Sequence, residues 1–206
     1  MFGILAIALF ATQTSAALDV SEYFPLELGS TWRYLGVSSD VKMHFTSTVQ
    51  EPVDFDGVIA IPIVTVFDVS TTEKNYYSVT ARSVDVVSFS EYEKLPAPYT
   101  ILQSPDVGEK WSVRAKTRVL GVFADLSLIG KVKRLRSRRF DGKSVDVLEV
   151  TLEGTIVEVG GILTEMKQVA VYGKGIGLME MKQTSKTGSM TTTLKLTLEE
   201  YLPGKS

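Results

Sequence analysis

Residues 145–150 read Val-Asp-Val-Leu-Glu-Val, and residues 194–198 read Leu-Lys-Leu-Thr-Leu. In the second stretch apolar and polar side chains alternate with a period of two, which is typical of a strand with one buried and one solvated face. The first stretch is mostly apolar with two acidic interruptions, and its valines suit the pleated surface of a sheet. Both stretches therefore predict β-strands.

Similar β-rich runs extend along most of the chain. They are rich in Val, Ile, Thr and Tyr and cover residues 58–69, 75–81, 84–89, 110–118, 154–159 and 169–172. Turns that contain glycine separate many of them, at residues 56–57, 141–142, 160–161 and 187–188. This succession of short strands and tight turns indicates an antiparallel sheet.

No segment shows a convincing helical period. The best candidate, Ser88 to Leu95, is short and is followed at once by Pro96 and Pro98, so we interpret it as a loop with at most one helical turn. The stretch from Leu95 to Pro105 is too short and apolar for a free linker, so it connects two parts of one sheet system. The sequence thus predicts an all-β fold, an antiparallel curved sheet that forms a half-barrel or a sandwich.

The first 17 residues differ from the rest. An apolar run from Phe2 to Ala11 precedes a small and polar stretch that offers small side chains at the −3 and −1 positions of a signal-peptidase site. No Lys or Arg precedes the run, which leaves a buried N-terminal strand or helix as the alternative. We predict a signal peptide at residues 1–17, cleavage that leaves Ala17 or Leu18 first, and one all-β domain at residues 18–206. The expected location is periplasmic or extracellular.

Composition limits the partners. The chain has 206 residues, 44% of them hydrophobic, and a net charge of −2, which argues against disorder and gives no electrostatic reason to expect nucleic acid. It contains no cysteine, so it has no disulfide, no thiolate zinc site and no lipid attached through an N-terminal cysteine. After the signal peptide, no apolar segment reaches the roughly 20 residues of a membrane helix. We therefore expect no nucleic acid partner, no transmembrane segment, no metal and no cofactor.

The chain repeats two short motifs in the same order. They are G-x-x-W at Gly29–Trp32 and Gly108–Trp111, and F-D-G at Phe55–Gly57 and Phe140–Gly142. Chance recurrence in a β-rich chain is the alternative, but two ordered coincidences favour an internal duplication. We predict two related β-meander units, about residues 24–101 and 102–206. Trp32 and Trp111 would then anchor the core at equivalent positions, with a stacking platform for sugars as the alternative role.

The same motifs carry a resemblance. Tyr23-Phe24-Pro25-Leu26 followed by Gly29-x-x-Trp32-x-Tyr34 resembles the opening of a broad group of uncharacterised exported bacterial proteins. These proteins are similar also in a second Pro…Gly-x-x-Trp and in a late glycine-rich segment, here Gly175 to Leu178. Many carry a lipid-attachment cysteine that this chain lacks, and the group implies no activity. In fold class the chain is also similar to the curved sheets of lipoprotein-localisation carriers, which hold acyl chains.

No motif predicts a catalytic residue. His44 is the only histidine and has neither a cysteine nor a second histidine as partner, so we predict a structural or surface role. Ser39 and Lys42, with Lys186-Thr187-Gly188, resemble serine β-lactamase motifs, but no helical pattern follows Ser39. Gly173 to Gly177 lacks the spacing and the helix of a phosphate loop, so we predict a bend or bulge in a strand. No pair of carboxylates has a spacing that forces a catalytic arrangement.

One dense basic run stands out. It consists of Lys131, Lys133, Arg134, Arg136, Arg138 and Arg139. Alternation along a strand would place Lys131, Lys133 and Arg139 on one face and the other three on the opposite face. The charges then either protect an edge strand or protruding hairpin from aggregation, or contact anionic lipid headgroups or polysaccharide.

Two long apolar runs favour ligand binding over a purely structural or interaction role. Residues 58–67 and 119–128 are long and apolar, and no predicted helix covers them. An uncovered apolar face on a soluble protein usually marks a binding site. We predict an exported, non-enzymatic binding protein for an apolar small molecule or lipid-like ligand. The alternative is an envelope or cell-surface protein–protein interaction or structural module.

Overall fold

The computed structural model describes most of the chain between residues 18 and 204. The described ranges are 18–39, 41–55, 57–68, 71–89, 94–103, 108, 110–119, 122–158 and 160–204. Residues 1–17 lie outside them, so the signal peptide stays a prediction. Within these ranges no helix is both long and apolar enough to cross a membrane.

The described chain consists of one short 3-10 helix and thirteen strands. They are η1 (Val20–Tyr23), β1 (Thr31–Ser38), β2 (Val41–Val49), β3 (Val53–Phe55), β4 (Val58–Phe67), β5 (Thr72–Val79), β6 (Ser83–Ser88), β7 (Lys94–Gln103), β8 (Lys110–Val119), β9 (Val122–Phe140), β10 (Lys143–Glu158), β11 (Leu163–Gly173), β12 (Gly177–Thr187) and β13 (Met190–Leu202). The prediction of an all-β antiparallel fold is confirmed.

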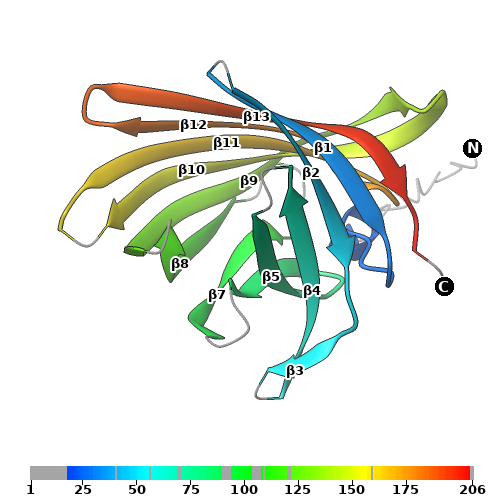
Figure 1. Ribbon diagram of the computed structural model, residues 1–206, viewed down its shortest axis with the longest axis horizontal. Helices are drawn as coiled ribbons and strands as arrows, with labels where there is room; N and C mark the ends of the chain where they lie inside the picture. Colours follow the sequence, from blue (N-terminus) through cyan, green and yellow to red (C-terminus); the bar gives the residue numbers. More distant parts are fainter. Residues whose placement is uncertain are drawn as a thin grey trace, which may run out of the picture.

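The strands form a single curved sheet. Their order is β7-β6-β5-β4-β2-β1-β13-β12-β11-β10-β9-β8, with β3 paired to β4, and every pair is antiparallel. The long strands β9–β13 make one broad layer, which curves over the shorter strands β4, β5 and β7 (Figure 1). The two end strands, β7 and β8, lie next to each other, and the indole Nε1 of Trp111 donates to the Thr100 carbonyl across this seam at 3.4 Å. The sheet is therefore a nearly closed barrel.

The chain runs as two successive meanders within this sheet. Strands β1–β7 form the first meander and β8–β13 the second, and the first and last strands of the chain join them through an antiparallel ladder from Thr31↔Leu202 to Ser38↔Leu194. The predicted boundary between units 24–101 and 102–206 falls inside β7, and the two units stay a prediction. That the two meanders share an origin stays a prediction.

Two boundaries differ from the sequence prediction. Residues 95–103, expected as a connection, belong to β7 despite Pro96 and Pro98. Proline is tolerated there because β7 ends the sheet and needs ladder hydrogen bonds on one side only. Residues 145–150 and 154–159, expected as separate strands, are parts of the single strand β10. Gly154 permits this continuity, because a Cβ there would lie 2.1 Å from the Ser127 carbonyl oxygen of the neighbouring strand.

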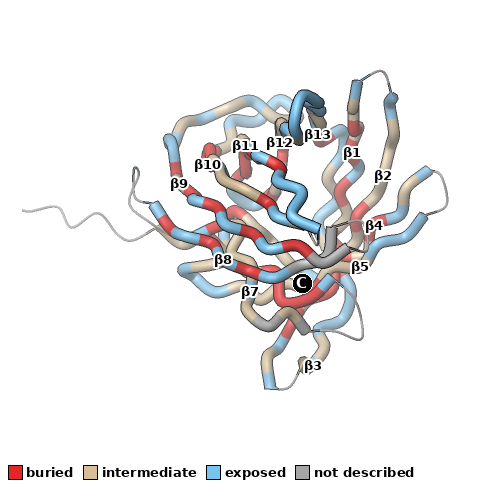
Figure 2. Tube along the Cα trace, turned by 90° about the vertical axis from the view of Figure 1, so that its left-hand side faces the viewer, coloured by how far each residue is buried: buried red, intermediate tan, exposed pale blue. Residues whose placement is uncertain are grey.

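Side chains alternate between the inside and the outside of the barrel. In β8, Trp111, Val113 and Ala115 are buried, whereas the residues between them are exposed. The same alternation of buried and exposed segments is visible along β8 and β9 in Figure 2. The buried side chains of β8–β11 form the largest apolar cluster of the protein, which also includes Val84 and Leu102 from β6 and β7.

The N-terminal segment closes one end of the barrel. The amide of Val20 donates to the Ala81 carbonyl in the β5–β6 turn, at 3.0 Å, and the Glu22 carbonyl accepts from the Gly175 amide in the β11–β12 turn, at 2.7 Å. The Glu22 carboxylate also pairs with Lys174 at 2.9 Å. Because the two turns belong to different meanders, η1 ties the halves together at this end.

Candidate ligand-binding cavity

A cavity of about 420 Å³ lies inside the barrel, mainly against the first meander. This volume falls within the roughly 300–1,000 Å³ of typical small-ligand sites. Strands β1, β2, β4, β5, β6 and β7 supply most of its wall. Strands β11–β13, Phe24 and Pro25 after η1, and Phe89 after β6 supply the rest. The lining is mostly apolar and aromatic, and its rings include Trp32, Tyr34, Phe45, Phe67 and Tyr77.

Small side chains keep this space open. Ser47 and Thr65 face each other on β2 and β4, and Gly36 lies further along β1, opposite Met43. All three line the cavity, where larger side chains would fill it. The Ser47 and Thr65 hydroxyl oxygens are 2.8 Å apart, so this buried polar pair satisfies itself within the wall. Small polar side chains can therefore line the cavity here without leaving a buried hydroxyl unpaired.

Aromatic rings cover the remaining wall beside these small residues. The ring centroids of Tyr34 and Phe45 are 5.2 Å apart and those of Phe45 and Phe67 are 5.3 Å apart, which is within the range of favourable aromatic pairs. The Tyr34 hydroxyl donates to the Leu178 carbonyl at 2.9 Å and so links β1 to β12 across the interior. This network fixes the shape of the wall.

The cavity is closed at the end that η1 covers. Phe24 packs there between Tyr77 and Tyr172, with ring centroids 5.3 and 6.3 Å away. At the opposite end, beyond the β4–β5 turn and the end of β6, the lining includes the exposed side chains Glu73 and Phe89. We therefore place the mouth of the cavity at this second end.

The interior of the cavity is electrically neutral apart from its mouth. Glu73 is the only charged residue among the described side chains of the lining. Burial raises the pKa of Tyr77 and of Tyr99 to about 12 and raises that of Tyr172 further, so these hydroxyls stay protonated at physiological pH. The cavity thus offers apolar surface with a few uncharged hydrogen-bonding groups.

The predicted basic run lies on β9 and begins at Lys131, which is opposite the first residue of β8. Pairing of β8 with β9 starts at Lys110↔Lys131, so the later part of β9 has β10 as its ladder partner among the described strands. This part of the run is therefore on an edge, as one of the two interpretations requires. Contact with an anionic surface stays a prediction.

The expected division of the basic run between two faces is wrong at Lys133. The register of β9 against β10 shifts between Glu149 and Val150, so Lys133 is an extra residue in a β-bulge. Lys133 and Arg136 consequently reach the same carboxylate, that of the buried Glu149, at 3.0 and 3.4 Å. The bulge breaks the period of two on which the expectation depended.

The other members of the run are spread along the strand. Arg138 pairs with Glu180 of β12 at 2.5 Å, Lys131 is half-buried and Arg139 is exposed. The side chain of Arg134 lies outside the described residues. At least three of the six cations therefore have carboxylate partners within the protein, and none of the described members lines the cavity.

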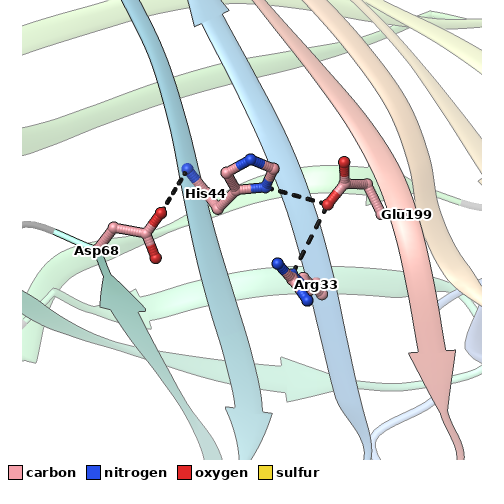
Figure 3. Close-up of polar contacts among 4 residues, drawn as sticks. All are labelled: Arg33, His44, Asp68 and Glu199. Carbon is pink, nitrogen blue, oxygen red and sulfur yellow. Dashed lines mark hydrogen bonds and ion pairs between the residues drawn. The ribbon is translucent and has the colours of Figure 1, made fainter.

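His44 lies on the side of β2 that faces away from the cavity. Its Nδ1 is 3.1 Å from the Glu199 carboxylate, which also contacts Arg33 at 3.7 Å, and its amide donates to Asp68 at 3.2 Å (Figure 3). All three ion-pair members are at least one-third exposed. The predicted surface role of His44 is confirmed.

The other motifs occupy turns. Ser39 has a positive φ of 53° between β1 and β2, and Lys186 to Gly188 lie at the β12–β13 turn, so neither sits on a helix. The segment from Gly173 to Gly177 forms the turn between β11 and β12, rather than the bend or bulge within a strand that we predicted. No group of three or more His, Asp or Glu side chains among the described residues has the arrangement of a metal site.

Both tryptophans are buried, as predicted. Trp32 and Trp111 are 5% and 7% exposed, and each is the second residue of the first strand of its meander. The Trp32 indole donates to the Ile176 carbonyl at 2.5 Å. With so little surface, neither ring offers a platform on which an exposed sugar can stack.

The sequence analysis did not identify the residues that shape the cavity. The available signal was the set of small residues Gly36, Ser47 and Thr65 at inward positions of otherwise apolar or aromatic strands. These positions become meaningful only when three strands are aligned side by side. Two of those strands are hairpin partners, but β4 joins β2 only after the β3 excursion.

Comparison with known proteins identifies the fold. No protein-family model matches the sequence, and the search among curated proteins gave no match. An inferred lipoprotein from Parabacteroides distasonis is 13% identical, with a TM-score of 0.56 over 87% of this chain and 98% of the other. An inferred exported protein with a YmcC-like fold from Bacteroides fragilis is 9% identical, with a TM-score of 0.55 and the same two coverages.

These likenesses show a shared fold and nothing more, because both identities are low. The predicted resemblance to exported bacterial proteins is thus confirmed at the level of fold, while the short motifs behind it stay a prediction. A domain of an inferred outer-membrane lipoprotein-sorting protein from Vibrio parahaemolyticus matches with a TM-score of only 0.27. That score is too low to support the predicted similarity to lipoprotein-localisation carriers.

Proposed function

We propose that the protein is an exported, non-enzymatic envelope protein that holds an apolar or lipid-like ligand inside its barrel. The cavity is the observation that carries the proposal, because it is apolar, closed at one end and open at the other. Sites of this kind bury most of a ligand's surface and use a few polar groups for orientation. Export through a signal peptide at residues 1–17, to the periplasm or outside the cell, is part of the same proposal.

A paired substitution on β13 tests the proposal. Leu196 lines the cavity. Thr193 is three residues earlier on the same strand, so the alternation of side chains points it to the opposite face, away from the cavity. Leu196→Glu places a carboxylate in the apolar interior, so it should weaken binding of the uncharged fluorophore N-phenyl-1-naphthylamine at least tenfold. Thr193→Glu adds the same charge outside and should leave binding within twofold of the wild type.

Native ligands provide the second readout. Lipid extract from the cell envelope should displace the fluorophore, and native mass spectrometry of protein purified from its own envelope should show an added lipid mass. A wild-type protein that binds neither the fluorophore nor any lipid would overturn the proposal.

A second function, docking on another envelope protein, has an observation of its own. Ile162, Leu163 and Met190 are exposed at the tips of the β10–β11 and β12–β13 hairpins, at 51%, 50% and 64%. Exposed apolar side chains grouped in this way often mark an interaction site. Replacing all three with Ser should abolish capture of an envelope partner while leaving the interior and its fluorophore binding unchanged.

The basic run adds a further proposal for the surface. Exposed cations on the edge of β9, such as Arg139, would contact anionic lipid headgroups or polysaccharide. Co-sedimentation with phosphatidylglycerol vesicles should fall when Lys133 and Arg139 are both replaced with Gln, and vesicles of phosphatidylcholine alone should bind neither protein.

A further inference from the structure

Three tyrosine hydroxyls lie together near the closed end of the cavity. Tyr77, Tyr99 and Tyr172 come from β5, β7 and β11, and all three line the cavity. Tyr77 and Tyr99 lie on either side of Val86 in the ladders of β5 with β6 and of β6 with β7. The ring of Phe24 packs against both Tyr77 and Tyr172, with centroids 5.3 and 6.3 Å away. Strands from both meanders therefore bring three identical polar groups to one place inside an apolar space.

Two of these hydroxyls have no hydrogen-bond partner in the described part of the chain. Among the described residues, neither the Tyr99 nor the Tyr172 hydroxyl takes part in a hydrogen bond. The Tyr172 side chain is 4% exposed as a whole. Its hydroxyl oxygen is nevertheless not one of the fully buried polar atoms that lack a hydrogen bond, so this oxygen keeps some contact with open space. It therefore faces the open space of the cavity, where a ligand or water must satisfy it.

The charges around the cavity exclude an anionic ligand group. No Lys or Arg is among the described lining side chains, and Glu73 lies at the mouth, where it would repel a carboxylate. The Glu73 charge reaches the interior, since it contributes to the raised pKa of Tyr77. A carboxylate at the closed end would be buried without a counter-charge, which costs far more than a hydrogen bond to tyrosine returns.

We propose that the cavity selects an uncharged lipid with a hydroxyl or ester group, and that this group binds Tyr99 and Tyr172 at the closed end while the chain extends toward the mouth. A protonated tyrosine both donates and accepts, so it can pair with the hydroxyl or with the ester carbonyl of an acylglycerol. The inference rests on the proposed function and names the class of ligand for the same cavity.

The test is competition against bound N-phenyl-1-naphthylamine at pH 8, with monopalmitoylglycerol and palmitate below their aggregation limits. The two competitors have the same chain and differ in the charge of the head. Monopalmitoylglycerol should displace the fluorophore at a concentration at least tenfold lower than palmitate. Equal displacement, or tighter binding of palmitate, would overturn the inference.

Substitutions then locate the contact. Tyr99→Phe and Tyr172→Phe should each weaken monopalmitoylglycerol binding roughly three- to tenfold, the equivalent of about 0.6–1.4 kcal/mol for one hydrogen bond. Tyr76→Phe is the matched control, because Tyr76 packs against Phe55 in a different cluster and does not line the cavity. Unchanged monopalmitoylglycerol affinity in both variants would refute the assigned contact.

The outcomes separate the two proposals. If the wild type binds the fluorophore but does not discriminate between the heads, the ligand-class inference fails and the proposed function stands. If nothing binds to a protein whose circular dichroism shows a folded sheet, the proposed function fails as well.

Discussion

The two meanders pass through the same barrel but fill it differently. The inner faces of β8–β11 are packed with apolar side chains such as Val113, Leu128 and Val150. The inner faces of β1, β2 and β4 combine large rings with Gly36, Ser47 and Thr65, and they border the cavity. A sheet of one topology therefore supports a solid core on one side and a ligand space on the other, depending on the size of the inward side chains.

The meanders also begin alike. Gly29 and Gly108 precede β1 and β8, and both have positive φ. The Gly29 amide donates to the Val49 carbonyl of β2 at 3.1 Å, and the Gly108 amide donates to the Val132 carbonyl of β9 at 3.0 Å. Strands β1 and β8 each have a buried tryptophan at their second position. These features support the proposed duplication. They also mean that the solid and hollow halves can be compared at equivalent sites.

The largest effect is expected from the tryptophan in the solid half. Trp111 covers Gly130 so closely that a Cβ on that glycine would lie 2.0 Å from the indole ring. Trp111→Ala should lower the free energy of unfolding by about 3–5 kcal/mol, whereas Trp32→Ala should fall at the lower end of that range because Trp32 borders the cavity. Urea unfolding measures both. A greater loss for Trp32 would reverse the comparison.

Two glycines sharpen the comparison further. Gly130→Ala should cost about 1–3 kcal/mol, since the indole of Trp111 must move. Gly36→Ala is the matched change in the hollow half, where a Cβ would meet its nearest atom, on Leu196, at 3.4 Å. It should cost less than about 1 kcal/mol. Similar losses in urea unfolding for the two variants would show that the two walls are packed alike.

The cavity tyrosines predict a loss of stability at high pH. The pKa of Tyr77 is raised from 10.0 to about 12, so between about pH 10 and 12 the unfolded chain releases a proton that the folded protein retains. The free energy of unfolding should therefore fall as pH rises through this window, by about 1–2 kcal/mol for Tyr77 after allowance for its partial solvent contact.

Tyr77→Phe is the variant that checks this effect. Its free energy of unfolding, measured between pH 9 and 11, should decline less steeply than that of the wild type. An identical slope in both proteins would show that the tyrosine is not shielded from solvent by the cavity wall.

The smallest effect is expected where the meanders meet on the outside. Glu199 of β13 contacts Arg33 and His44 of the first meander, but all three side chains are exposed (Figure 3). Glu199→Gln should change the free energy of unfolding by less than about 0.5 kcal/mol, and added salt should reduce even that difference. A loss above 1 kcal/mol would mean that these surface charges, rather than the β1–β13 ladder, hold the halves together.

Local sequence patterns predicted the presence of strands and turns better than the residues at which strands begin, end or bulge. The alternation at residues 194–198 correctly identified part of β13, and the Asp141-Gly142 pair correctly marked the β9–β10 turn. Pro96 and Pro98 predict a connection where the structure has β7, because an end strand tolerates proline. The bulge at Lys133 left no signal in the sequence, because it arises from the register between β9 and β10.

Composition and periodicity by themselves determined that this chain forms antiparallel strands, that both tryptophans are buried and that His44 has neither a cysteine nor a second histidine to act with. These properties depend on each residue and its near neighbours, so they can be read along the chain. Only the tertiary structure decided that a cavity exists and that Tyr77, Tyr99 and Tyr172 share it. The physical reason is that a cavity is a difference in volume between side chains of strands far apart in the sequence, and that difference is fixed only when the sheet curves and closes.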